Sequence, residues 1–85
     1  MAEETELLDR ITVRTDIFNG KPIIRDMRFA VEHVLEMLAA GNTAENILSE
    51  YPLLEPEDIQ ACLFFAHRSV AGEEIHDRIP VQQAS

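Results

Sequence analysis

The sequence has little of the residue types that build several common kinds of site. It holds one cysteine, three scattered glycines and no tryptophan, and its longest apolar run covers residues 61–66. One cysteine excludes an internal disulfide, and the run is far shorter than the ~20 residues of a membrane span. The acidic start, Met-Ala-Glu-Glu, argues against a signal peptide. We therefore expect a cytoplasmic protein with no membrane partner.

Residue groups that bind metals or perform catalysis are also missing. His33, His67 and His76 are too far apart in the sequence to form a local metal-ligand pair. Cys62 falls on an apolar helical stripe, where a thiol acts as a small core residue. No glycine-rich phosphate loop is present. We expect no metal, no cofactor and no enzymatic activity.

Charge is distributed unevenly. The formal net charge is −9, yet residues 10–28 hold five bases against two acids. Residues 29–85 hold ten acids against two bases. The acidic body either keeps a small protein soluble or attracts a basic protein partner.

The first part of the chain predicts a small β element. Residues 1–9 look like a flexible acidic leader, and Ile11–Arg14 alternates as a strand does. Asn19-Gly20 predicts a turn, and a returning strand is expected near residues 23–25. Pro22 makes that strand an edge strand. Exposed apolar edges seek another strand, so we predict a homodimer joined through the N-terminal strands.

The rest of the domain, which we bound at residues 10–71, predicts three helices. The first begins at Val31 and stops at Gly41, and the second is capped by Thr43. The third begins at Pro56. Its expected buried stripe consists of Ile59, Cys62, Leu63, Ala66 and Val70. The fold class is therefore mainly α with a small β element: short N-terminal strands or a hairpin, then a three-helix, helix-turn-helix unit.

A helix-turn-helix unit raises the question of DNA binding. The candidate recognition helix, residues 55–71, begins with Glu55, Glu57 and Asp58, whereas phosphate contacts need cations. Any DNA contact should therefore lie in the basic strand segment. The candidate nucleic-acid-binding residues are Arg14, Lys21, Arg25 and Arg28.

Two other places are candidates for protein contact. Phe64 and Phe65 are adjacent on the third helix and cannot both face its core, so Phe64 is a candidate interface residue. Residues 72–85 form a C-terminal tail. There Ile75 and Ile79 would share one face of a helix that forms on a partner.

Five sequence pieces together are distinctive. They are Asn19-Gly-Lys-Pro-Ile-Ile-Arg25, Met27-Arg-Phe-Ala-Val31, Val34-Leu-Glu-Met-Leu-Ala-Ala-Gly41, Ile47-Leu-Ser-Glu-Tyr-Pro52 and Glu55-Pro-Glu-Asp-Ile-Gln-Ala61. In this order, across residues 11–66, the chain resembles domain-of-unknown-function family 433, which includes VapB-like antitoxins. Many members have glycine where Asp26 stands and proline where Ala30 stands.

The resemblance implies a homeodomain-like fold and an antitoxin role. The implied partner is a PIN-like ribonuclease toxin, which the chain would neutralise, and operator DNA is a further implied ligand. Two alternatives stay open: a stand-alone DNA-binding transcriptional regulator, and an oligomeric structural module.

Overall fold

The protein is mainly helical and carries one small sheet. A computed structural model describes residues 4–72. Its elements in chain order are α1 (Glu4–Leu8), β1 (Ile11–Val13), the 3-10 turn η1 (Phe18–Gly20), β2 (Pro22–Ile24), α2 (Val31–Ala39), α3 (Ala44–Glu50) and α4 (Pro56–Gly72). The predicted fold class is confirmed. Ile75 and Ile79 lie outside the described residues, so the predicted role of the tail stays a prediction.

The helical boundaries follow the sequence signals closely. Thr43 caps α3, because its Oγ1 accepts a hydrogen bond of 3.1 Å from the backbone N–H of Asn46. Gly41 ends the turn after α2 with a φ of 100°, which only glycine adopts without strain. Pro56 is the first residue of α4, as predicted.

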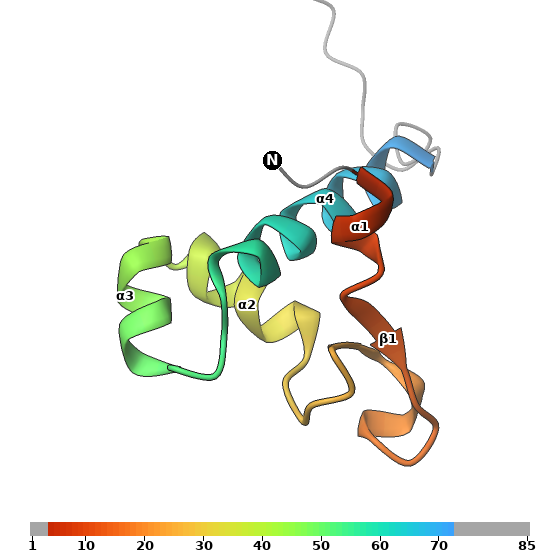
Figure 1. The fold of residues 1–85 in the computed structure, drawn as a ribbon. Helices are drawn as coiled ribbons and strands as arrows, with labels where there is room; N and C mark the ends of the chain where they lie inside the picture. Colours follow the sequence, from red (N-terminus) through yellow and green to blue (C-terminus); the bar gives the residue numbers. More distant parts are fainter. Residues whose placement is uncertain (1–3, 73–85) are drawn as a thin grey trace, which may run out of the picture.

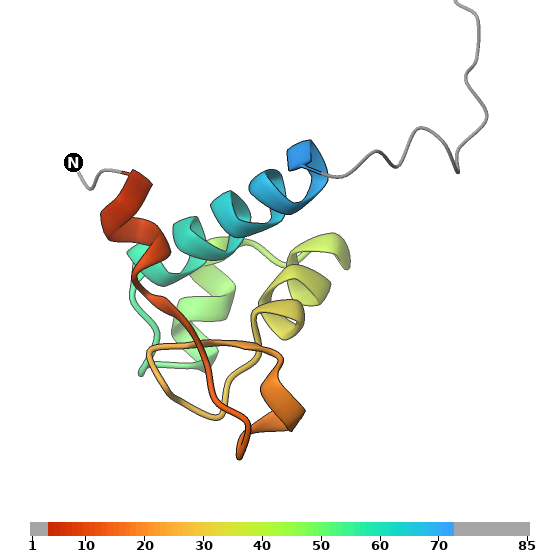
Figure 2. The same ribbon diagram turned by 90° about the vertical axis from the view of Figure 1, so that its right-hand side faces the viewer.

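The N-terminal segment differs from the flexible leader that we predicted. Residues 4–8 form α1, which packs against α4 (Figures 1 and 2). Leu7 is buried in that contact. Because only two leucines, Leu7 and Leu8, stand among the acids, the segment has the composition of a solvated leader, and only tertiary packing reveals the helix.

The sheet has two short antiparallel strands, with Ile11 opposite Ile24 and Val13 opposite Pro22. Asn19 and Gly20 have positive φ values as expected, but they belong to η1 within a longer connection, not to a two-residue hairpin turn. Ile23 and Ile24 are fully buried within one chain. The apolar edge that motivated a strand-mediated homodimer is therefore covered, and that dimer remains an untested prediction.

A tight turn follows β2 and holds two residues in left-handed backbone. The Met27 N–H donates 2.8 Å to the Ile24 carbonyl, and Arg25 and Asp26 between them have φ values of 44° and 58°. Left-handed backbone favours glycine, which is the residue that the resemblance described above implies at position 26. Asp26 holds the conformation here, and its N–H donates 2.9 Å to Thr12 Oγ1.

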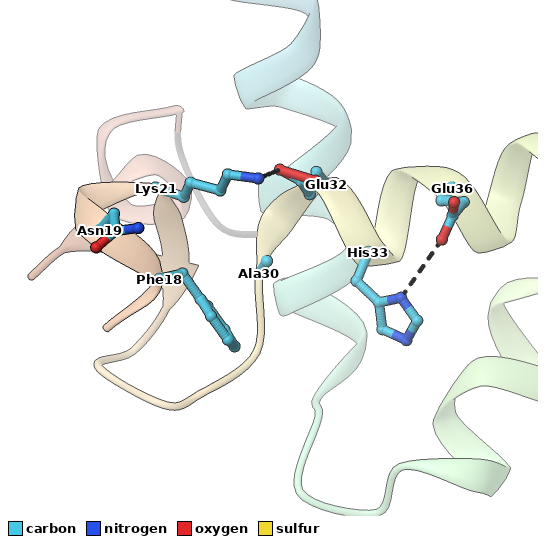
Figure 3. Close-up of a pocket in the computed structure, with 7 residues that line it drawn as sticks. All are labelled: Phe18, Asn19, Lys21, Ala30, Glu32, His33 and Glu36. Carbon is cyan, nitrogen blue, oxygen red and sulfur yellow. Dashed lines mark ion pairs between the residues drawn. The ribbon is translucent and has the colours of Figure 1, made fainter. Parts of the chain in front are cut away.

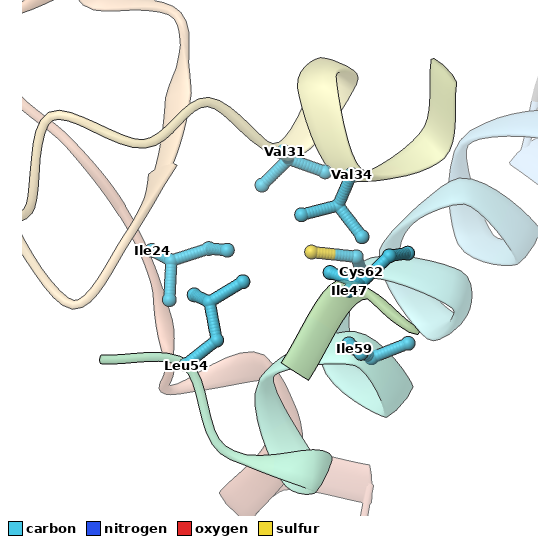
Figure 4. Close-up of a cluster of buried hydrophobic side chains, with 7 residues drawn as sticks. All are labelled: Ile24, Val31, Val34, Ile47, Leu54, Ile59 and Cys62. Atoms are coloured by element: carbon cyan, nitrogen blue, oxygen red, sulfur yellow. The ribbon is translucent and has the colours of Figure 1, made fainter. Parts of the chain in front are cut away.

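The core lies where α2, α3 and α4 meet the second strand (Figure 4). Its fully or nearly fully buried members are Ile24, Val31, Val34, Ile47, Leu54, Ile59 and Cys62. The predicted stripe of α4 is partly wrong. Leu63 and Val70 are exposed, while Asp58 and Ala61 are buried, so the helix presents a face rotated toward residues 58, 61 and 65.

Candidate functional site

A buried carboxylate sits at the start of α4. Asp58 is fully buried, and both of its oxygens face arginines. Arg25 makes a two-pronged contact, with Nε 3.1 Å from Oδ1 and Nη2 2.8 Å from Oδ2. Arg10 Nη1 adds a third bond of 3.0 Å to Oδ1. Paired, planar contacts of this kind are the strongest that a carboxylate makes with arginine.

The same carboxylate also caps its own helix. The backbone N–H of Glu55 donates 2.8 Å to Asp58 Oδ2, which is the return bond of a capping box. Arg10 further bonds Glu55 Oε1 at 2.7 Å, and Arg25 Nη2 bonds the Leu53 carbonyl at 2.8 Å. This ion-pair cluster (Arg10, Arg25, Glu55 and Asp58) joins the strands to the turn between α3 and α4.

Burial alone would raise the pKa of Asp58, since a charged group is disfavoured away from water. Hydrogen bonds from Arg25, the Glu55 N–H and Arg10 outweigh that effect, and the pKa lies below its usual 3.8. The carboxylate is therefore ionised at neutral pH. Each of its two oxygens already accepts two hydrogen bonds, so the carboxylate has no remaining acceptor site for a substrate or a metal ion.

The four predicted nucleic-acid contacts do not form an open basic surface. Arg14 pairs with Asp16 at 2.9 Å, Lys21 with Glu32 at 3.0 Å, and Arg25 with Asp58. The Arg14 hydrogen bond holds the pKa of Asp16 below its usual value. Among the described residues, the Arg28 side chain makes no hydrogen bond or ion pair. Internal pairing thus neutralises three of the four cations.

A pocket of about 400 Å³ lies between η1 and the start of α2 (Figure 3). Lys21 and Glu32 pair across its edge, and His33 Nδ1 lies 3.7 Å from Glu36 Oε1. The centroids of the His33 and Phe29 rings are 5.4 Å apart. Within residues 4–72 no three His, Cys, Asp or Glu side chains are arranged to hold a metal ion.

A second hollow, of about 590 Å³, lies beside the turn between α3 and α4. We call it the turn groove. Phe29 and Tyr51 meet edge to face in it, with centroids 4.9 Å apart. Leu53 stands at its lip with 78% of its surface exposed. Arg28 and Glu50 also line it, so the groove is apolar with one cation and one anion.

The outer face of α4 carries apolar side chains in solvent. Leu63 and Val70 are 50% and 58% exposed, and seven residues bring them to the same side of a helix. Phe64 is half-buried, and its ring stacks on His67 with centroids 6.1 Å apart. Sequence reasoning selected Phe64 but assigned Leu63 and Val70 to the core. By sequence, Asp58 was named only among the acids at the start of this helix, and no local signal indicates that it is buried.

Cys62 is fully buried next to this face. Burial, together with the nearby Asp58 charge, raises the pKa of its thiol to about 12. A thiol with so high a pKa stays protonated at neutral pH and is a poor nucleophile.

Comparison with known proteins identifies the family. The model of a family described as "Protein of unknown function (DUF433)" matches residues 11–66. The chain belongs to the DUF433 family. The matched residues run from β1 into α4, so they include Arg25 and Asp58 but not Arg10.

A curated relative is similar over two thirds of the chain. It is the uncharacterized protein y4eO of Sinorhizobium fredii, which is 34% identical over 56 residues. The match covers 66% of this chain and spans a quarter of the relative's length. No solved structure matches significantly. In residues 4–72, no helix has both the length and the apolar character to cross a membrane.

Proposed function

We propose that this DUF433 chain is an antitoxin-like protein-binding module, with no enzymatic activity of its own, that neutralises a PIN-like ribonuclease. The observation that carries the proposal is the outer face of α4. Leu63 and Val70 are exposed there on one side of the helix, with the half-buried Phe64 next to Leu63. Grouped apolar side chains on a helix surface are typical of a protein contact site.

The charge of the chain favours a basic partner. The formal net charge is −9, and several of its few cations are used internally, in ion pairs with Asp58, Asp16 and Glu32. A negative field speeds association with a positively charged surface and selects against wrong partners. Enzymes that hold RNA present such surfaces to the phosphate backbone. Apolar contact and charge together fit a ribonuclease better than they fit nucleic acid.

A DNA-binding regulator has less support. Binding through Arg14, Lys21 or Arg25 would compete with their ion pairs to Asp16, Glu32 and Asp58. The first turn of α4 is acidic, with Glu57 and Asp58, which disfavours docking of that helix in a DNA groove. Binding of operator DNA stays a prediction.

The test is inhibition of purified PIN-like ribonucleases, beginning with any that is encoded beside the gene for this chain. Cleavage of a fluorogenic RNA is followed as the chain is titrated into the enzyme. We expect stoichiometric inhibition by the wild type. The double variant Leu63→Asp with Val70→Asp should inhibit at least about tenfold more weakly, because two buried carboxylates would oppose the contact.

Leu53→Asp is the control, since it makes the same change at a more exposed leucine, which lies at the turn groove and not on α4. It should inhibit as the wild type does. Equal inhibition by the wild type and the α4 double variant would move the contact away from α4. No inhibition by the wild type would contradict the antitoxin role itself.

A further inference from the structure

The turn groove combines an apolar hollow with three side chains, namely an exposed leucine, a base and an acid. It is a hollow next to a protruding leucine, and its rim holds one base and one acid. Leu53 is the most exposed large apolar side chain among the described residues. A hollow and a projection on one surface are complementary when two copies meet around a two-fold axis.

The charges at the rim are free to make such a contact. Within residues 4–72, neither Arg28 nor Glu50 makes a side-chain hydrogen bond or ion pair, and they do not pair with each other. The acid nearest to Arg28 by charge interaction is Asp16, and that carboxylate is already hydrogen-bonded to Arg14. In a two-fold contact each rim charge meets its opposite once in each direction, so two ion pairs form.

We propose that the turn groove is a self-association site. Leu53 of each copy enters the groove of the other, against the edge-to-face pair of Phe29 and Tyr51. Arg28 of each copy faces Glu50 of the second copy. A second copy of the chain supplies a leucine for the hollow and an opposite charge for each rim charge, so every group of the site has a partner. A different protein would satisfy only part of these groups.

The site differs from the predicted strand-mediated dimer and from the outer face of α4. Ile23 and Ile24, which motivated the strand-mediated dimer, are buried within the chain, and Val13 is the large apolar side chain that the described strands expose. The proposal also does not depend on a ribonuclease partner, since its residues lie around the α3–α4 turn. A groove of this size covers less than a standard interface, so we expect a weak dimer with a dissociation constant on the order of 100 µM.

The test is sedimentation equilibrium of the full chain from about 10 µM to 1 mM, a range that brackets the expected constant. The wild type should pass from monomer to dimer. Arg28→Glu and Glu50→Arg should each weaken association at least tenfold, because like charges would then face each other twice. An equimolar mixture of the two variants should regain the affinity of the wild type, since both contacts in the mixed dimer join opposite charges.

The apolar part has its own pair of variants. Leu53→Asp should abolish the dimer, while Leu63→Asp, at a half-exposed leucine on α4, should leave it unchanged. Circular dichroism melts establish that each variant is folded. A wild type that stays monomeric to 1 mM overturns the proposal, as does a dimer that survives Leu53→Asp. Failure of the charge-reversed mixture to associate would also overturn it, because reciprocal contacts require that rescue.

Discussion

The two halves of α4 differ from the usual arrangement, in which charged side chains are exposed and apolar side chains are buried. At its first turn a carboxylate, Asp58, is fully buried, while farther along the same helix Leu63 and Val70 stand in solvent. The buried charge is compensated by two arginines and a backbone N–H, so nothing further is needed. The exposed apolar side chains have no such compensation within the described residues. The buried charge therefore has all its partners within the chain, whereas the exposed apolar side chains form a candidate surface for contact with another protein.

The largest effect should come from the buried charge. Asp58→Ala leaves the guanidinium groups of Arg10 and Arg25 without their carboxylate and removes the capping bond from Glu55. We expect a loss of about 3 kcal/mol in unfolding free energy, at the low end for buried pairs because both arginines are partly exposed. Urea denaturation measures it. Asp58→Asn, which keeps an acceptor for the Glu55 N–H, should lose less, and equal losses would show that the cap contributes nothing.

Acid should weaken the same cluster. The pKa of Asp58 is lowered in the folded chain, so its pairing stabilises the fold above the unfolded pKa near 3.8. That stability is lost as the pH falls below about 4, toward the folded pKa. Unfolding free energies of the wild type should decline more steeply across this range than those of Asp58→Asn. Parallel curves would mean that other carboxylates cause acid unfolding.

A smaller loss of stability is expected from a change at Cys62, on the buried side of α4. Cys62→Ser places a hydroxyl in the apolar core and should cost about 1–2 kcal/mol, as an unsatisfied polar group does. Cys62→Ala is the control for lost volume. Urea denaturation of both variants separates the two costs, and a serine variant as stable as the alanine variant would mean that the hydroxyl finds a partner.

The smallest effect on stability belongs to the neighbouring residue. Leu63→Asp changes an exposed side chain and should alter the unfolding free energy by no more than about 0.5 kcal/mol. Thermal unfolding measures the difference from the wild type. A loss comparable to that of Cys62→Ser would show that Leu63 is packed, and the outer face of α4 would no longer qualify as a contact surface.

The sequence predicted what local rules control and missed what distant contacts control. Thr43, Gly41 and Pro56 begin or end helices through bonds and backbone angles within a few residues, so their roles were readable. The burial of Asp58 depends on Arg25, which is 33 positions away. No local pattern reports such a pair, and Arg25 was therefore predicted as a nucleic-acid contact.

The exposed residues of α4 show the same limit. Helical spacing groups Leu63 and Val70 with Ile59 and Cys62, and apolar character alone cannot say where the buried arc ends. The arc is set by what α1 and the ion-pair cluster cover. For the candidate site, composition predicted the acidic character of the surface but not which side chains form it.

The Arg10 bond to Asp58 also bears on where this domain begins. The family match starts at residue 11, yet Arg10 and the α1 helix that packs on α4 lie just before it. A fragment trimmed to residues 11–66 would keep the family's motifs and discard one of the two arginines that hold a buried anion. The cooperative folding unit of this chain is therefore longer than its recognisable family segment, and domain excisions should begin no later than Glu4.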